Sequence, residues 1–367
     1  VEIATATKGV AYMEDPTFDP QKVYTLFVDP ERSSDLSVTG EYRRVGSSWD
    51  LPLNNIRVAL AFFQQLSQGT SGLQDVDGNA LPAWDPSEYR YQILVKEGTC
   101  TPTINTGSDI LRAASIWMDN DVALYGSFDG ALTGTATDSR NPMTHTTEIS
   151  GEVMNAGFAY NSAHLVQFGN VNNAILDGFR LTLGNAGSQN GYEADGKGAG
   201  IRVRNDQTMY DNGQGFGVHD IPASDRKEMD NNIVRNCLIS NCGATDGAAI
   251  YMESVSADQK ATLKLENVII HNNGTNYNAK GNIAQNASYS VLNTSVPGSH
   301  SAVYVGKNAR LEMNHSDVLR NVAYGVYVDE GGEADIRNTI LYANLDKETE
   351  ETNEWDKQTG SNPPQLM

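Results

Sequence analysis

Three tyrosines and one arginine stand at the same position of four short apolar segments in the second half of the chain. The segments cover residues 198–203, 247–252, 301–305 and 324–328. Side chains alternate between the two faces of a β-strand, so one face of each segment should point into a core and the other outward. We align the inward positions at Ile201, Ile250, Val303 and Val326. The outward column then contains Arg202, Tyr251, Tyr304 and Tyr327.

Such a column has a chemistry that suits carbohydrates. Tyrosine rings can pack on sugar rings while their hydroxyls bond sugar hydroxyls. The next outward column mixes charges of both signs, since it contains Arg204, Glu253, Gly306 and Asp329. We therefore predict ligand binding by Arg202, Tyr251, Tyr304, Tyr327 and Glu253. The alternatives are tyrosines that only stabilise the sheet or lie beneath a loop, and charges that form a solvated face.

The same region could hold a catalytic site that cleaves polysaccharides. A polysaccharide lyase needs a cation to neutralise the uronate carboxylate, a base to remove the α proton and an acid for the leaving oxygen. Lys197, Arg202 and Arg204 lie together in the sequence and are the candidates for the cationic part of such a site.

A glycine-rich stretch over 205–230 offers carboxylates to a metal ion. Asp206, Asp211 and Asp220 are candidate Ca²⁺ ligands, because Ca²⁺ prefers oxygen donors. Their spacing is not that of an EF-hand, and Ca²⁺ is the one cofactor that the sequence suggests. The 6 histidines show no metal-ligand spacing, and 3 cysteines are too few for a disulfide framework. We expect Cys237 to be buried, with a bridge to Cys242 as the alternative.

One amphipathic helix precedes the strands. Asp50 is its expected N-cap, and Ile56, Ala59, Leu60 and Phe63 form an apolar face at helical spacing. Such a helix could cover the first repeat of a solenoid. We therefore divide the chain into residues 1–70 with an N-terminal strand and capping helix, 71–345 with repeated strands, and an acidic tail or cap over 346–367.

The repeats have a recognisable pattern of asparagines and apolar residues. In five segments a polar residue, usually Asn, precedes an apolar strand. The segments are 175–182, 234–241, 265–272, 315–321 and 336–342. Each of the first four leads to one of the partner segments above, which predicts two strands and several turns per repeat. Asn241, Asn272 and Asn321 should stack as an amide ladder. Long insertions are expected near 187–198, 206–232 and 274–300.

Composition restricts the partners. The formal net charge is -20, which disfavours nucleic acid and anionic membranes. No apolar run reaches the roughly 20 residues of a membrane-spanning helix. The chain begins at Val1 without Met, which is typical of a mature or trimmed chain.

The chain resembles the right-handed parallel β-helix superfamily that includes pectate-lyase-like enzymes, and most of all bacterial secreted and cell-surface β-helix proteins. The resemblance covers about residues 23–345 and rests on Val28-Asp29, Gly46-Ser47-Ser48-Trp49, the strand 124–128, Leu176-Asp177-Gly178-Phe179 and the repeats. Residues 246–250 are also similar to a repeat of outer-membrane autotransporters. The resemblance implies a single-stranded right-handed parallel β-helix, exported to the medium or the cell surface.

Three functions follow as hypotheses. The first is a non-catalytic module that binds a polysaccharide or surface glycan, or acts in adhesion. The second is a carbohydrate-active enzyme, in particular a polysaccharide lyase. The calcium-binding aspartates and catalytic arginine of pectate lyases cannot be mapped onto residues of this sequence, and neither can the carboxylates of β-helix galacturonidases. The third is a structural stalk whose loops bind a protein partner.

Overall fold

The structure, a computed structural model, consists mostly of short strands. It describes residues 22–32, 46, 49–69, 79–103, 111–130, 140–153, 160–187, 195–211, 216–274, 301–322 and 324–344. The expected tail or cap over 346–367 lies outside these residues, as do nearly all of the insertion near 274–300 and the middle of the one near 187–198. Two 3-10 turns also occur, at Leu111–Ala113 and Ala223–Asp225.

Three parallel sheets and one hairpin contain all the strands of the described residues. The eight-stranded sheet comprises β1 Val23–Val28, β2 Arg90–Lys96, β5 Val122–Phe128, β8 Ile175–Asp177, β13 Met229–Arg235, β16 Ala261–Glu266, β19 Ala309–Asn314 and β22 Glu333–Arg337. The seven-stranded sheet comprises β3 Gly98–Cys100, β6 Thr147–Ser150, β9 Phe179–Thr182, β14 Leu238–Ser240, β17 Ile269–His271, β20 Asp317–Leu319 and β23 Ile340–Tyr342. The six-stranded sheet comprises β4 Ile116–Trp117, β7 Val166–Gly169, β10 Ile201–Arg204, β15 Ile250–Glu253, β18 Ser301–Val305 and β21 Tyr324–Val328. The antiparallel hairpin pairs β11 Gln207–Asp211 with β12 Phe216–Asp220.

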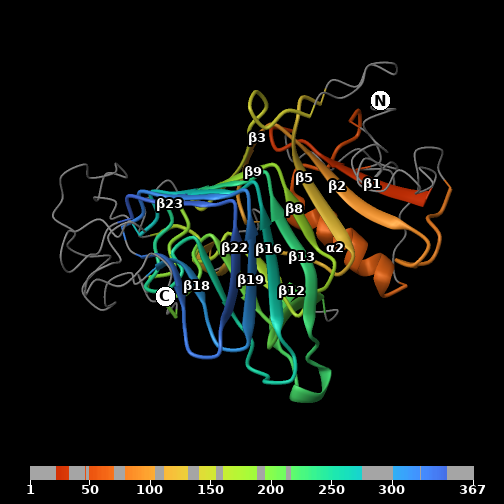
Figure 1. The fold of residues 1–367 in the computed structure, drawn as a ribbon. Coiled ribbons are helices and arrows are strands. Elements are labelled where there is room, and N and C mark those ends of the chain that lie inside the picture. The colour runs from red at the N-terminus through yellow and green to blue at the C-terminus, as the bar shows by residue number, and fades with distance from the viewer. Residues whose placement is uncertain are drawn as a thin grey trace, which may run out of the picture.

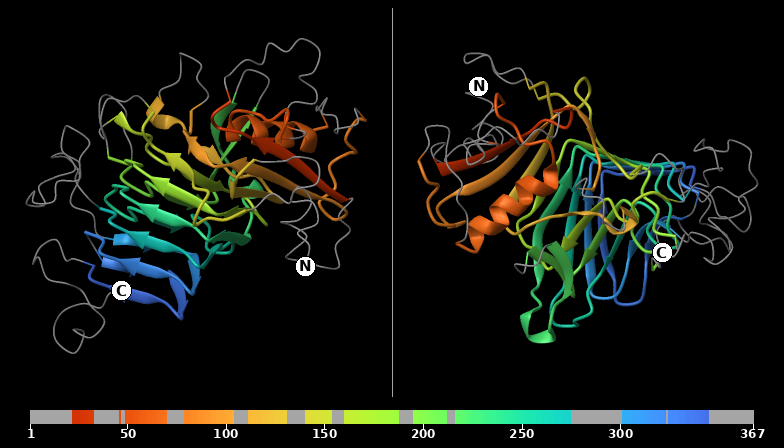
Figure 2. Two further views of the ribbon diagram at one scale, coloured as in Figure 1. Left: turned by 90° about the horizontal axis from the view of Figure 1, so that it is seen from above. Right: turned by 180° about the vertical axis from the view of Figure 1, so that it is seen from behind.

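From β2 onward the chain visits the three sheets in a fixed order. It passes from the eight-stranded to the seven-stranded to the six-stranded sheet and then begins again, so that neighbours within each sheet come from successive passes. In Figure 2 the strands accordingly follow one another in chain order from the N-terminal to the C-terminal side. This mostly β architecture with long parallel sheets is compatible with a parallel solenoid.

Each complete pass contains three strands, so the prediction of two strands per repeat was wrong. The segment 175–182 was taken as one strand, but it contains β8 and β9, which belong to different sheets. Gly178 separates them with φ +79, a left-handed conformation that few side chains tolerate. Asn236, Asn267 and Asn338 hold the equivalent corner with φ between 49 and 54. The asparagines that mark the repeats therefore form corners, where the chain changes sheet.

An amide ladder is present, and it contains one of the three expected residues, Asn321, with Asn273 and Asn344 in place of Asn241 and Asn272. The side chain of Asn273 donates to Asn321 Oδ1 at 3.0 Å, and that of Asn321 donates to Asn344 Oδ1 at 2.9 Å, all three being fully buried. Asn241 and Asn272 instead lie one position earlier, at left-handed corners. Buried amides need hydrogen-bond partners, and the next pass supplies them.

The interior is apolar and continuous. The four residues predicted to face inward, Ile201, Ile250, Val303 and Val326, are fully buried in one core cluster. All three cysteines are buried and free, so the alternative of a Cys237–Cys242 bridge was wrong. Among the described residues, no helix is long and apolar enough to cross a membrane.

The predicted helix is α2, Ile56–Ser67, and its apolar face is confirmed because Ile56, Ala59, Leu60 and Phe63 are buried. It packs against β1, β2 and β4, at the end of the sheets nearest the N-terminus (Figure 1). The N-cap prediction was wrong. Asn55, not Asp50, caps the helix by accepting a hydrogen bond from the Arg57 backbone N–H at 2.8 Å.

Replacing Asn55 by Ala should lower the free energy of unfolding by about 1 kcal/mol, because the first turn loses its cap. The same side chain also donates to the Thr103 carbonyl at 2.7 Å, so part of the loss comes from that contact. The measurement is the midpoint of urea unfolding. Ser67→Ala, at the exposed far end of the helix, is the control. Equal shifts for the two variants would contradict the capping role.

Candidate functional site on the six-stranded sheet

One outward column runs across the whole six-stranded sheet. The strand registers place six residues in it, in the order Trp117, Gln167, Arg202, Tyr251, Tyr304 and Tyr327. The last four are those aligned from the sequence. The first two were missed because β4 is only two residues long and neither β4 nor β7 carries the repeat pattern. The first four members of the column are buried, Tyr251 being only 1% exposed, whereas Tyr304 and Tyr327 are half-buried.

The tyrosines pack on one another, not as a flat platform. The centroids of the Tyr251 and Tyr304 rings are 5.0 Å apart with an interplanar angle of 13°, and those of Tyr304 and Tyr327 are 5.3 Å apart at 22°. Each ring therefore covers a face of its neighbour. The ammonium nitrogen of Lys197 lies 4.8 Å from the centroid of Tyr251, a cation–π contact. Tyr327, on the edge strand β21, is the end of the stack within the described residues.

Carboxylates lie beside two of these rings. The hydroxyl of Tyr251 donates to Glu253 and the hydroxyl of Tyr304 donates to Asp329. Burial, followed by the adjacent carboxylate, raises the pKa of both phenols well above the ordinary value. The tyrosines therefore stay protonated as donors, and a row of hydroxyl–carboxylate pairs follows the stack.

Arg202 is held from two sides. The residue is 7% exposed, and its guanidinium bonds Asp195 and lies 3.1 Å from His164 Nε2. The other nitrogen of that histidine, Nδ1, lies 2.9 Å from the Gly198 carbonyl oxygen. A carbonyl only accepts, so Nδ1 carries the proton and Nε2 accepts from Arg202. Burial, and then the positive charge of Arg202, lowers the pKa of His164 to about 4.

The cationic cluster predicted for a lyase is fully compensated. Lys197 Nζ lies 3.7 Å from Glu253, Arg202 bonds Asp195, and Arg204 makes a two-point contact with Asp206. Three cations thus meet three carboxylates, and their formal charges sum to zero. Burial acts to lower the pKa of Arg204, but the Asp206 carboxylate outweighs it and the net effect raises that pKa.

The three predicted Ca²⁺ ligands lie along the β11–β12 hairpin, with Asp206 directly before β11. Asp206 is engaged with Arg204, and Asp220 accepts from Gln207 at 3.2 Å. Asp211 lies at the far end of the hairpin, opposite Phe216, and its side chain is outside the described residues. Within the described part of the chain, no group of three or more His, Cys, Asp or Glu side chains gathers as metal ligands do. A calcium ion here stays a prediction.

Sequence reasoning missed the importance of His164. It precedes β7, has no repeat pattern around it and contacts Arg202 only because the two strands are neighbours. His271, at the end of β17, is half-buried, and burial lowers its pKa.

Comparison with known proteins identifies no relative. No family model, no curated protein and no solved structure matches this chain.

Proposed function

We propose that the chain is a right-handed single-stranded parallel β-helix, capped by α2 and exported to the medium or the cell surface, and that it binds glycans without cleaving them. The fixed order in which the chain visits three parallel sheets supports this fold. We also propose that it belongs to the pectate-lyase-like superfamily. The observation that carries the function is the tyrosine stack, which ends at Tyr327 on an edge strand with carboxylates beside it.

The stack suggests how a sugar chain would be held. The outer face of Tyr327 can pack against a pyranose ring, because the other face is taken by Tyr304. Glu253 and Asp329 retain lone pairs that can accept from sugar hydroxyls while they accept from tyrosines.

Charge favours a neutral glycan over a uronate. Binding a uronate at Lys197, Arg202 or Arg204 would require breaking ion pairs that are already made within the protein. The row of carboxylates along the stack would further repel an anionic chain. A lyase has therefore less support from this geometry than a binding surface has.

The proposal predicts that Tyr327→Ala weakens retention of the protein by a neutral polysaccharide in a native affinity gel. Loss of one stacking contact should raise the dissociation constant about fivefold to tenfold. Tyr342→Ala is the matched control, because Tyr342 is 52% exposed but belongs to the seven-stranded sheet. The gels would contain neutral and uronate polysaccharides, with and without Ca²⁺.

The outcomes separate the three functions. Retention lost in Tyr327→Ala but kept in Tyr342→Ala supports the binding surface. New reducing ends or unsaturated products, abolished by Arg202→Ala or Lys197→Ala, would replace it with the lyase. Absence of retention on every glycan would overturn the proposal and favour a stalk that binds a protein partner. Retention only with Ca²⁺ would support a calcium requirement.

A further inference from the structure

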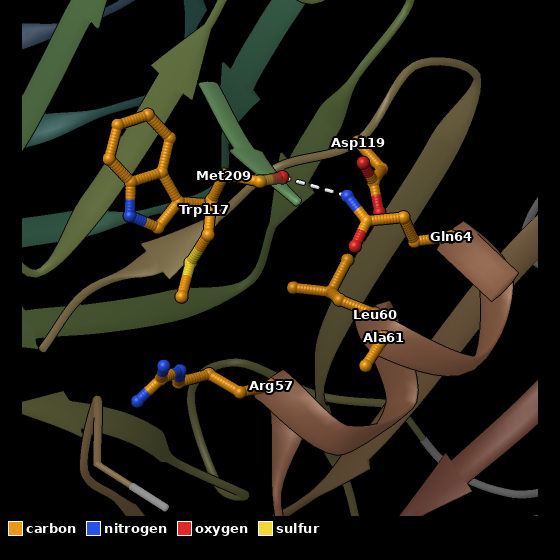
Figure 3. Close-up of a pocket in the computed structure, with 7 residues that line it drawn as sticks. All are labelled: Arg57, Leu60, Ala61, Gln64, Trp117, Asp119 and Met209. Atoms are coloured by element: carbon orange, nitrogen blue, oxygen red, sulfur yellow. Dashed lines mark hydrogen bonds between the residues drawn. The ribbon is translucent and has the colours of Figure 1, made fainter. Parts of the chain in front are cut away.

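The cavity beside Trp117 is too small to hold a ligand of any size. It lies between α2, β4 and the β11–β12 hairpin, where Trp117, Asp119 and Met209 line it, and its volume is about 30 Å³ (Figure 3). That space holds about two water molecules. Gln64 Nε2 donates to the Met209 carbonyl at 2.7 Å and so ties the helix to the hairpin. A larger partner therefore needs an open surface of the protein.

The outer face of the seven-stranded sheet offers such a surface. In Figure 1 the strands of this sheet, among them β9 and β23, run along the upper side of the molecule. One outward column contains Arg180, Leu238, Ile269 and Asp317, from the neighbouring strands β9, β14, β17 and β20. Ile269 is 41% exposed, Arg180 is exposed, and the other two are half-buried. Apolar side chains thus lie in the middle of the column, with a cation at one end and a carboxylate at the other.

The two charged ends are able to take a partner. The carboxylate of Asp317 makes no hydrogen bond or ion pair with the described residues. Arg180 makes one ion pair within the same part of the chain, with 3.5 Å between its Nε and a carboxylate oxygen of Glu148, and its side chain stays 44% exposed. Exposed pairs of this kind are weak. A complementary surface would therefore bring a cation to Asp317, a carboxylate to Arg180 and apolar side chains between them.

We infer that this complementary surface belongs to a second copy of the chain. A twofold axis that runs parallel to the strands, between β14 and β17, reverses the order of the column in the second copy. Arg180 of each copy then faces Asp317 of the other, and Leu238 faces Ile269. The four residues form a self-complementary patch, about 14 Å long at the usual spacing of strands.

The charge of the chain makes this register specific. The formal net charge is -20, so two copies repel each other unless local charges oppose that repulsion. Two reciprocal ion pairs around an apolar centre do so at one register of the column. Glu148, Ile340 and Tyr342 lie at the margins of the patch, outside its four residues. Because the patch is small, the dimer should be weak and should form as the concentration rises.

The test is the mass of the intact protein, measured by sedimentation equilibrium over about a hundredfold range of concentration. We expect the wild type to pass from monomer to dimer. Ile269→Glu places a carboxylate beside the axis in both copies and should weaken association about tenfold or more. Asp258→Arg, on an exposed turn away from this sheet, is the control for a change of charge and should leave the dimer in place.

Charge reversal gives a sharper result. Arg180→Asp and Asp317→Arg each place like charges opposite one another across the axis, so each variant alone should stay monomeric. An equimolar mixture of the two variants restores both ion pairs and should form a heterodimer. The protein that carries both substitutions should dimerise as the wild type does. Urea unfolding midpoints close to that of the wild type will show that the variants are folded.

The results can also contradict the inference. A wild type that stays monomeric at every concentration would overturn it and leave the column to a different partner. A dimer that Ile269→Glu leaves intact would overturn it as well, because that dimer would use another surface. Failure of the two charge variants to associate with each other, while the wild type dimerises, would overturn the twofold arrangement. Glycan retention through Tyr327 uses the six-stranded sheet, so dimerisation and retention can each succeed or fail without the other.

Discussion

Replacing Asp177 by Asn should lower the free energy of unfolding by about 3 kcal/mol, since removing one partner of a buried ion pair leaves the others uncompensated. Asp177 is 1% exposed at the end of β8. Its carboxylate bonds Arg140, accepts from Arg235 Nε at 2.6 Å and accepts from Asn236 at 2.9 Å. An amide of the same size cannot neutralise two guanidinium groups, so both cations would face each other across the corner.

The guanidinium groups keep some contact with water, since both arginine side chains are 18% exposed, and this limits the loss to the lower part of the usual range. The measurement is the shift of the urea unfolding midpoint. Asp335→Asn is the matched control, because Asp335 pairs with Arg337 on the exposed strand β22, and its midpoint should not move. An unchanged midpoint for Asp177→Asn would show that the corner does not depend on this charge.

Arg140 also covers the outer face of the eight-stranded sheet near its N-terminal end. Its guanidinium carbon lies 5.6 Å from the centroid of the Tyr125 ring and 5.9 Å from that of Phe128. The Leu-Asp-Gly-Phe motif, from which the family resemblance was partly drawn, is thus a charged corner with a glycine in left-handed conformation. Such a motif reports architecture, and it carries no information about a ligand.

The sequence predicted the apolar side of the fold well, because burial leaves a local pattern. The spacing of Ile56, Ala59, Leu60 and Phe63 was enough to find the buried helix face. Alternation in 201–204, 250–253 and 324–328 was enough to align the inward residues and the outward column. Both patterns follow from the geometry of a single element, so they can be recognised without knowledge of its neighbours.

What the sequence could not predict depends on corners and on contacts between distant residues. A single corner residue such as Asn236 does not interrupt the apolar pattern of the residues on either side of it. The end of β13 and the whole of β14 were therefore predicted as one strand. Of the three residues predicted for the amide ladder, only Asn321 belongs to it. Asn241 and Asn272 each lie one residue before the position that forms the ladder. Segments that are far apart in the chain also determine three features of the site. These are the stacking of the tyrosine rings, the ion partners of the cationic cluster and the cavity beside Trp117.

Acid should destabilise this protein through His164, by about 3 kcal/mol between pH 6.5 and pH 4. In the folded state the pKa of His164 is lowered to about 4, whereas an unfolded chain has the ordinary value of 6.5. Between these values the unfolded state binds more protons than the folded state, so the stability that is present above pH 6.5 is lost as the pH falls to 4. Protonation of Nε2 would place a second positive charge against Arg202, 3.1 Å away.

Asp119 acts with the opposite sign, and the test must separate the two. Its pKa is raised from 3.8 to about 7, so the folded state binds more protons and stability falls as the pH rises through that window. In the wild-type protein the dependence of stability on pH is therefore the sum of two opposing contributions, from His164 and from Asp119. His164→Gln removes one of them, since an amide can donate to Gly198 and accept from Arg202 without titrating. The wild type should gain about 3 kcal/mol relative to that variant between pH 4 and pH 7. A difference that stays constant with pH would mean that His164 is not the neutral partner of Arg202.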